Sequence, residues 1–73
     1  MRLKKLLKRM VNLDYVLLNE GVLDNPILYQ VSEIYENHKN LLDRQVIFVN
    51  AVLVKQPPFC HEVPVVKVII KEV

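Results

Sequence analysis

The 73-residue sequence contains very little cysteine, glycine or aromatic side chain. Cys60 is the single cysteine, which excludes a disulfide within the chain and the disulfide-framework class of small domains. Gly21 is the single glycine, which excludes glycine-rich phosphate-binding loops and glycine-rich linkers. The three tyrosines and two phenylalanines are not interleaved with basic residues, so a base-stacking platform for single-stranded nucleic acid is not expected. The composition indicates one ordered domain, residues 1–73.

Long apolar runs are also missing. No run approaches the roughly 18 residues that a membrane-spanning helix requires, so we expect no membrane span. The basic start followed by leucines is not a signal peptide, because Lys8, Arg9, Asn12 and Asp14 interrupt the apolar stretch and no small-residue cleavage site follows. We therefore expect a cytoplasmic protein in a reducing compartment.

What the sequence has in abundance is apolar side chain, at 52% of residues. A domain of this size buries a small fraction of its surface and is marginally stable alone, so disulfides, metals or association usually support it. Since one cysteine cannot form an internal disulfide, association is the expected support. The pattern therefore predicts a homodimer.

Residues 1–43 show the periodicity of two helices. Apolar residues follow helical spacing over residues 3–19, with Gly21 placed as a C-terminal cap. After a connection at residues 22–25, Asn25 is a favourable N-cap and Pro26 a favourable first residue for a second helix over residues 26–43. Its apolar stripe comprises Ile27, Leu28, Val31, Ile34, Tyr35, His38, Leu41 and Leu42. The short connection predicts an antiparallel helical hairpin.

Residues 45–73 change to the pattern of strands. The runs 45–55 and 63–73 are rich in β-branched residues, and Pro57-Pro58 predicts a turn at residues 56–62. The first run is apolar on both expected faces: Val46, Phe48, Val52 and Val54 on one, and Ile47, Val49, Ala51 and Leu53 on the other. The second run places Val66, Val68 and Ile70 on one face. Two helices cover only one face of such a sheet, so the other face requires a partner.

The predicted fold is α+β: a helical hairpin (1–43) followed by a two-stranded antiparallel β-hairpin (45–73), in the order α-α-β-β. Dimerisation completes it, either through the second face of the sheet or by edge-to-edge pairing of strands. The residues predicted to form the core or the dimer surface of this sheet are Val46, Phe48, Val52, Val54, Ile47, Val49, Leu53, Val66, Val68 and Ile70.

A cluster of cations without acids opens the chain, formed by Arg2, Lys4, Lys5, Lys8 and Arg9. Clustered cations on one helix face can contact the phosphates of a nucleic acid or an anionic membrane surface. The same pattern also fits a solvated face opposite an apolar one, which is the commoner case.

Other polar residues favour no catalytic or metal site, and no cofactor is expected. Cys60, His61 and Glu62 are adjacent in the predicted turn, where neighbouring side chains point in opposite directions, and a metal site needs further ligands. His38 lies in an apolar stripe, where a core or interface histidine is the expected role, with pH-sensitive assembly as the alternative. Glu33 and Glu36 lie on an exposed helix face without a desolvating pocket.

Residues 20–43 (EGVLDNPILYQVSEIYENHKNLLD) resemble the small helical-hairpin aspartyl-phosphate phosphatases of sporulation regulators. Their Ser-Gln-Glu-Leu-Asp motif would correspond to Ser32-Glu33-Ile34-Tyr35-Glu36, which retains the serine. The resemblance covers about a third of the chain, and it implies that Glu36 would stand in for the catalytic aspartate.

The favoured prediction is a small non-enzymatic regulatory or protein-interaction module that acts as a homodimer, with another protein as a further partner. The alternatives are a nucleic-acid-binding dimer that uses the basic residues and a regulator similar to the helical-hairpin phosphatases.

Overall fold

A computed structural model describes residues 1–21 and 25–72. Its elements are, in chain order, helix α1 (Leu3–Leu7), strand β1 (Tyr15–Glu20), strand β2 (Ile27–Gln30), helix α2 (Val31–Asn37), the 3-10 helix η1 (Lys39–Leu41), strand β3 (Val46–Val54) and strand β4 (Val63–Ile70). Residues 22–24 of the predicted connection (22–25) lie outside the described residues, and so does Val73.

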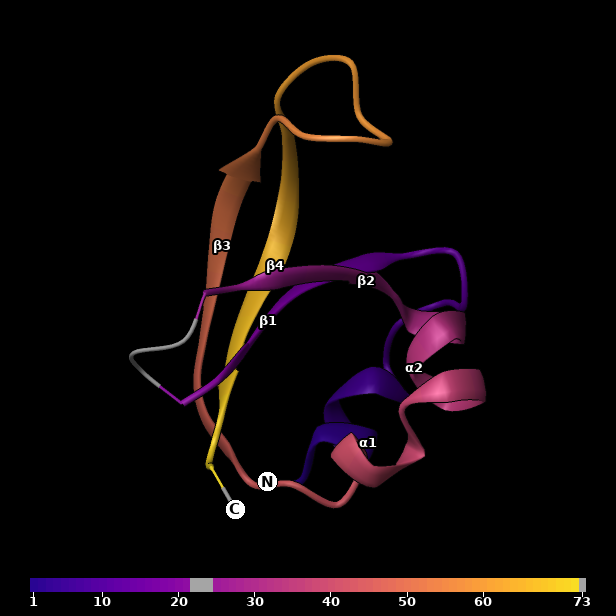
Figure 1. Ribbon diagram of the computed structural model, residues 1–73, viewed down its shortest axis with the longest axis vertical. Helices are drawn as coiled ribbons and strands as arrows, with labels where there is room; N and C mark the ends of the chain where they lie inside the picture. Colours follow the sequence, from indigo (N-terminus) through magenta and orange to yellow (C-terminus); the bar gives the residue numbers. More distant parts are fainter. Residues whose placement is uncertain (22–24, 73) are drawn as a thin grey trace.

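The four strands form one mixed sheet in the order β2-β1-β4-β3. β1 runs parallel to β4, and the two outer pairs are antiparallel. Figure 1 shows β3 and β4 rising together past β1 and β2, with α1 and α2 gathered on one side of the sheet. β4 is therefore an inner strand, and β3 is an edge strand.

The predicted helical hairpin is wrong, and so is the two-stranded sheet. The first predicted helix (3–19) ends after Leu7, because a turn at residues 11–14 redirects the chain. In this turn the Asp14 carboxylate accepts the Val11 N–H at 3.1 Å, while the Asp14 N–H donates to the Val11 carbonyl at 3.0 Å. Residues 15–20 then form β1, with Val16 and Leu18 facing the core. The two leucines of this strand, Leu17 and Leu18, also fit the spacing of a helix.

The second predicted helix (26–43) is divided between β2, α2 and η1. Ile27–Gln30 pairs with β1, and the Val31 N–H donates to the Asp14 carbonyl at 2.8 Å, which fixes the start of α2. His38 leaves the helical region at φ −133° and ψ 43°, which ends α2. Competition from sheet pairing therefore overrides the helical periodicity of this stretch.

One face of the sheet carries the hydrophobic core. The helices contribute five buried side chains to it: Leu3 and Leu7 from α1, Val31 and Ile34 from α2, and Leu41 from η1. They pack on the buried side chains of the two inner strands, Val16, Leu18, Val68 and Ile70. The short helices thus cover β1 and β4, and of β3 only Val46 packs against this core.

The C-terminal strands pair antiparallel, as the sequence predicted, and Val66, Val68 and Ile70 share the core face. A bulge at Ile47 alters the predicted faces of β3: Val46 lies opposite Ile70, whereas Phe48 lies opposite Ile69. The extra residue places Val46 on the core face and not on the face that carries Phe48 and Val52.

Gly21 follows β1 and is not a helix cap. Its φ of +87° is favourable for glycine alone. Its N–H donates to the Ile70 carbonyl at 2.9 Å, and a Cβ at this position would collide with the Glu72 side chain. The glycine therefore allows the ends of β1 and β4 to approach closely.

Among the helices of the described residues, none has the length and apolar character needed to cross a membrane.

Candidate interaction surface on strand β3

β3 presents apolar side chains to solvent on both of its faces. The exposed fractions are 55% for Ile47, 49% for Phe48, 42% for Val49 and 65% for Leu53. Between Gln45 and Lys55 the strand carries no charge, and Asn50 is its only polar residue. We call residues 47–53 the β3 edge. Natural edge strands usually carry charges, prolines, bulges or covering elements that prevent pairing. Apart from the bulge at Ile47, the described residues place none of these on the β3 edge.

The backbone of β3 shows which groups are available for pairing. The Ala51 N–H donates to the Asn50 side-chain Oδ1 at 2.9 Å, so this N–H points away from β4. Alternate residues of an antiparallel strand direct their N–H and C=O groups to the same side. Val49, Ala51 and Leu53 therefore direct their backbone groups outward, toward the open side of the sheet.

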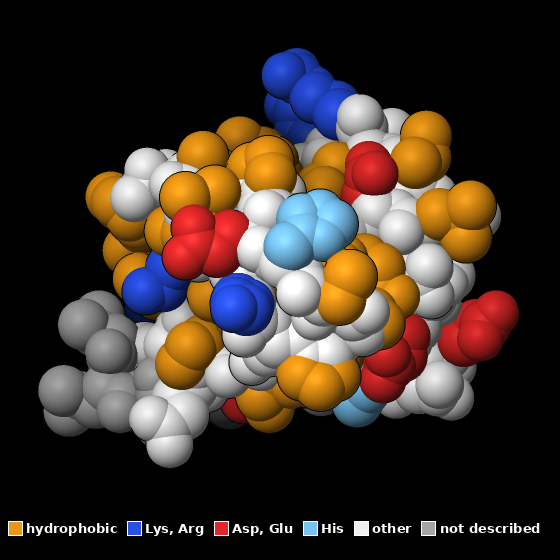
Figure 2. All heavy atoms as spheres, turned by 90° about the horizontal axis from the view of Figure 1, so that it is seen from above, with side chains coloured by type: hydrophobic (Ala, Val, Ile, Leu, Met, Phe, Trp, Pro, Cys, Tyr) orange, Lys and Arg blue, Asp and Glu red, His pale blue; other side chains and the backbone are white. Residues whose placement is uncertain are grey.

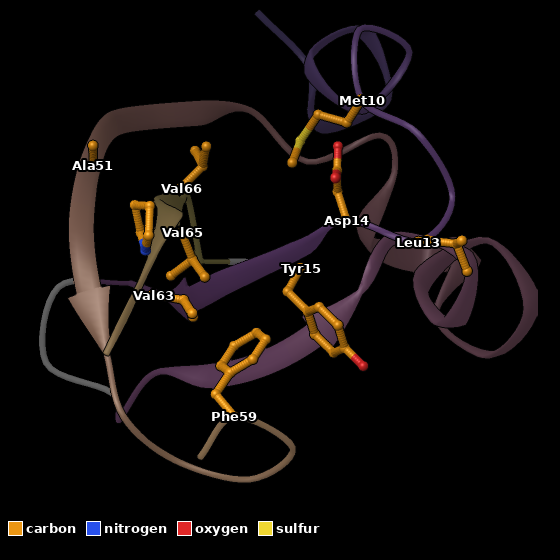
Figure 3. Close-up of a pocket in the computed structure, with 10 residues that line it drawn as sticks. Met10, Leu13, Asp14, Tyr15, Ala51, Phe59, Val63, Val65 and Val66 are labelled. Carbon is orange, nitrogen blue, oxygen red and sulfur yellow. The ribbon is translucent and has the colours of Figure 1, made fainter. Parts of the chain in front are cut away.

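A hollow of about 520 Å³ lies beside β3, and Ala51 is part of its wall. Figure 3 shows Val65 and Val66 between Ala51 on one side and Met10 and Asp14 on the other. The Phe59 ring closes another side and packs edge-on against Tyr15, with the ring centroids 5.0 Å apart. Asp14 supplies the only charge in this lining, and its carboxylate is already engaged by the Val11 N–H. The hollow therefore extends the apolar surface of β3 and brings no reactive groups together.

The five predicted phosphate-contacting residues are all exposed, but they are not equivalent. Arg2 donates from Nη1 to the Asp43 carbonyl at 2.7 Å, and Lys4 Nζ lies 3.5 Å from the Asp43 carboxylate. In the part of the chain that the structure describes, Lys5, Lys8 and Arg9 form no ion pair. In Figure 2, one group of basic side chains projects at the upper edge of a face on which hydrophobic side chains are interspersed with acidic, basic and other polar ones.

The structure brings Cys60 and His61 together, contrary to the prediction. A bend in the exposed loop places Cys60 Sγ 3.4 Å from His61 Nδ1, where an extended backbone would have separated them. Across residues 1–21 and 25–72, no group of three or more histidine, cysteine or acidic side chains is placed to hold a metal ion.

His38 lies at the C-terminal end of α2, which also carries Glu33 and Glu36. His38 Nε2 is 3.9 Å from a Glu33 carboxylate oxygen, and its ring packs against that of Tyr29 at 4.8 Å. Burial raises the pKa of the Tyr29 hydroxyl, and Glu20 and Glu33 add to the effect. Glu36 is exposed and Ser32 is half-buried, in a stretch that lacks the helical hairpin implied by the phosphatase resemblance.

Sequence reasoning identified the exposed apolar residues of β3 but did not single out Asn50. The available signal was a lone polar residue at the centre of an uncharged, β-branched run. The hollow could not be foreseen, because it depends on Tyr15 and Phe59 meeting across 44 positions of the chain.

No family model, curated protein or solved structure matches this chain.

Proposed function

We propose that this protein is a small non-enzymatic interaction module that forms a homodimer through the β3 edge. One observation carries the proposal: an uncharged edge strand with exposed apolar side chains on both faces. The Val46 N–H already donates to the Met1 carbonyl at 2.7 Å, so the open part of the strand is residues 47–53. This part extends over roughly 23 Å, enough for several backbone hydrogen bonds with a second strand. Pairing it would cover Ile47, Phe48, Val49 and Leu53 together.

The chemistry of the remaining surface supports an interaction role. Lys4 pairs with Asp43 at the exposed surface, and among the described residues no group of three or more histidine, cysteine or acidic side chains is placed to hold a metal ion. The proposal includes a reducing, cytoplasmic compartment, which the single exposed thiol of Cys60 favours.

The direct test is size-exclusion chromatography with light scattering over a range of protein concentrations. We expect a dimer for the unmodified chain and a monomer for Val49→Lys, because a lysine on an edge strand opposes pairing. The matched control is Val11→Lys, which also charges an exposed apolar side chain but lies outside both β3 and the hollow. A monomeric unmodified chain, or a Val49→Lys variant that stays dimeric, would refute the proposal.

Nucleic acid is a second candidate partner, favoured by the exposure of Lys5, Lys8 and Arg9 without ion pairs among the described residues. Replacing all three by glutamate is expected to abolish binding to duplex DNA. If all three contact phosphates, the unmodified chain should show a salt-dependence slope that includes a contribution of about −3 from them. Lys39→Glu, an exposed lysine outside the cluster, serves as the control. Binding that is absent or independent of salt would eliminate this candidate.

A further inference from the structure

We propose that two copies pair their β3 strands antiparallel around a two-fold axis at Asn50, which joins two four-stranded sheets into one. This inference rests on the proposed homodimer and specifies its geometry. A two-fold interface is self-complementary, so each residue must be compatible with its symmetric counterpart. The register therefore follows from the length, polarity and backbone direction of β3.

Strand length gives the first indication of this register. Because the Val46 N–H already donates to the Met1 carbonyl at 2.7 Å, the stretch of β3 open to pairing is 47–53, and Asn50 is its midpoint. Full overlap of two antiparallel copies places Asn50 opposite Asn50 of the second copy, Val49 opposite Ala51, and Phe48 opposite Val52. The bulge at Ile47 lies outside these five central pairs, so the middle of the new ladder is regular.

Backbone direction is compatible with the same register. The outward-facing groups of Val49 and Ala51 would meet in a hydrogen-bonded pair. The two Asn50 residues would then form a non-hydrogen-bonded pair, in which Cα atoms approach to about 4.5 Å and side chains are closest. A carboxamide both donates and accepts, so two of them can bond to each other across a two-fold axis.

The side chain of Asn50 has a different task in the free chain. Its Oδ1 accepts the Ala51 N–H at 2.9 Å and so satisfies one donor on the open edge. In the paired state the Ala51 N–H donates to the Val49 carbonyl of the second copy. This releases Oδ1 to accept a hydrogen bond from the carboxamide of the opposite Asn50. The same side chain therefore satisfies a backbone donor in the free chain and lies on the two-fold axis in the dimer.

A register centred on Ala51 is the main competitor, since it would pair the regular stretch 48–54 with itself. It would place Asn50 opposite Val52 of the second copy, where the carboxamide meets an apolar side chain. A polar group covered without a hydrogen-bond partner costs stability. Polarity therefore favours the axis at Asn50.

Cysteine cross-linking distinguishes the two registers, in a Cys60→Ser background that removes the native thiol. The Asn50-centred axis brings the Cα atoms at position 50 within the range of about 4.4–6.8 Å that a disulfide spans. The same axis separates the two copies of residue 51 diagonally, beyond the limit of about 7 Å. We expect Asn50→Cys to form a covalent dimer in a mild redox buffer, and Ala51→Cys to remain uncross-linked on a non-reducing gel.

Cross-linking of Ala51→Cys without Asn50→Cys would overturn the register. If neither cross-links while the unmodified chain is a dimer by light scattering, pairing at this axis is wrong but the homodimer stands. A monomeric unmodified chain would instead refute the proposed function itself. The three results are thus distinguishable.

A second variant tests the chemistry of Asn50 without cross-linking. Asn50→Asp keeps the shape of the side chain but places two carboxylates on the axis, and we expect dimerisation to weaken by roughly tenfold or more at neutral pH. Asn40→Asp makes the same change at an exposed position outside β3 and should leave the dimer unaffected. Equal dimerisation of the Asn50→Asp variant and the unmodified chain would contradict the proposed axis.

Discussion

Strands β3 and β4 are neighbours of similar composition, but their side chains differ in how deeply they are buried. Val49 in β3 and Val68 in β4 lie directly opposite each other, yet Val49 is 42% exposed and Val68 is completely buried. The residue type is the same, and so are the sheet and the face. Position in the strand order is what differs, because β4 has a strand on each side and β3 has one.

The helices explain why β3 is not covered. α1 has five residues and α2 has seven, and their buried side chains pack on β1 and β4. Among the described residues of β3, Val46 alone packs against this core. The comparison indicates that the fold is complete at its centre and open at one edge.

The largest expected effect comes from making the same substitution at the two paired valines. Val68→Ala should lower the free energy of unfolding by about 2 to 3 kcal/mol, through lost burial and a residual cavity. Val49→Ala should change it by less than about 0.5 kcal/mol, since surface substitutions rarely do more. Urea denaturation extrapolated to low protein concentration measures both values without the contribution of association. Equal losses would show that the two strands do not differ as described.

The close approach of β1 and β4 at Gly21 gives the next effect. Gly21→Ala should cost about 1 to 2 kcal/mol, because alanine disfavours the left-handed backbone. Thermal unfolding followed by circular dichroism measures the change. A second variant, Gly21→Ala with Glu72→Ala, removes the steric contact with Glu72. It should recover only the part of the lost stability that this contact causes. Full recovery would mean that the backbone conformation is not the cause.

Substitutions of the two phenylalanines test the loop between β3 and β4, which contains Phe59, against the β3 edge, which contains Phe48. Phe59→Ala should destabilise the chain by more than Phe48→Ala at low concentration, because Phe59 packs edge-on against Tyr15 and Phe48 is exposed. The ring pair itself is worth about 0.5 to 1.5 kcal/mol, which a double-mutant cycle with Tyr15→Ala isolates. Additive losses in the cycle would show that the two rings do not interact.

The smallest effect concerns pH and the opposite edge strand, β2. The folded chain raises the pKa of Tyr29 above its ordinary value of 10.0, through burial and then the charges of Glu20 and Glu33. The neutral hydroxyl is therefore favoured by folding, so its stabilising contribution is complete below this pH and is lost as the pH rises through the folded pKa. Urea denaturation at pH values above the ordinary tyrosine pKa of 10.0 measures this effect. The free energy of unfolding should fall less with rising pH for Tyr29→Phe than for the unmodified chain. Parallel curves for both chains would contradict the assignment.

Sequence patterns were reliable where local preference and burial agree. The β-branched runs became β3 and β4, and the Pro57-Pro58 segment separates them. The failure lay in residues 15–43, where Leu17, Leu18 and Leu28 fit a helical period yet pair in a sheet. The parallel pairing of Val16 with Val66 joins residues 50 positions apart, and no local pattern specifies such a contact. The exposed side chains of β3 were predictable from composition, whereas the role of Asn50 needed the backbone direction.

β4 lies between β1 and β3 in the sheet, yet the ribosome makes it after both. β3 therefore leaves the exit tunnel before β4, the strand with which it pairs in the sheet. From the start of β3 at Val46 to the end of β4 at Ile70 is a stretch of 25 residues, which takes roughly one to five seconds to synthesise. Until β4 has followed it, β3 is an uncharged, β-branched segment that lacks the strand with which it pairs in the sheet. The order of the strands therefore makes β3 the last strand of the sheet to gain its partner within the fold.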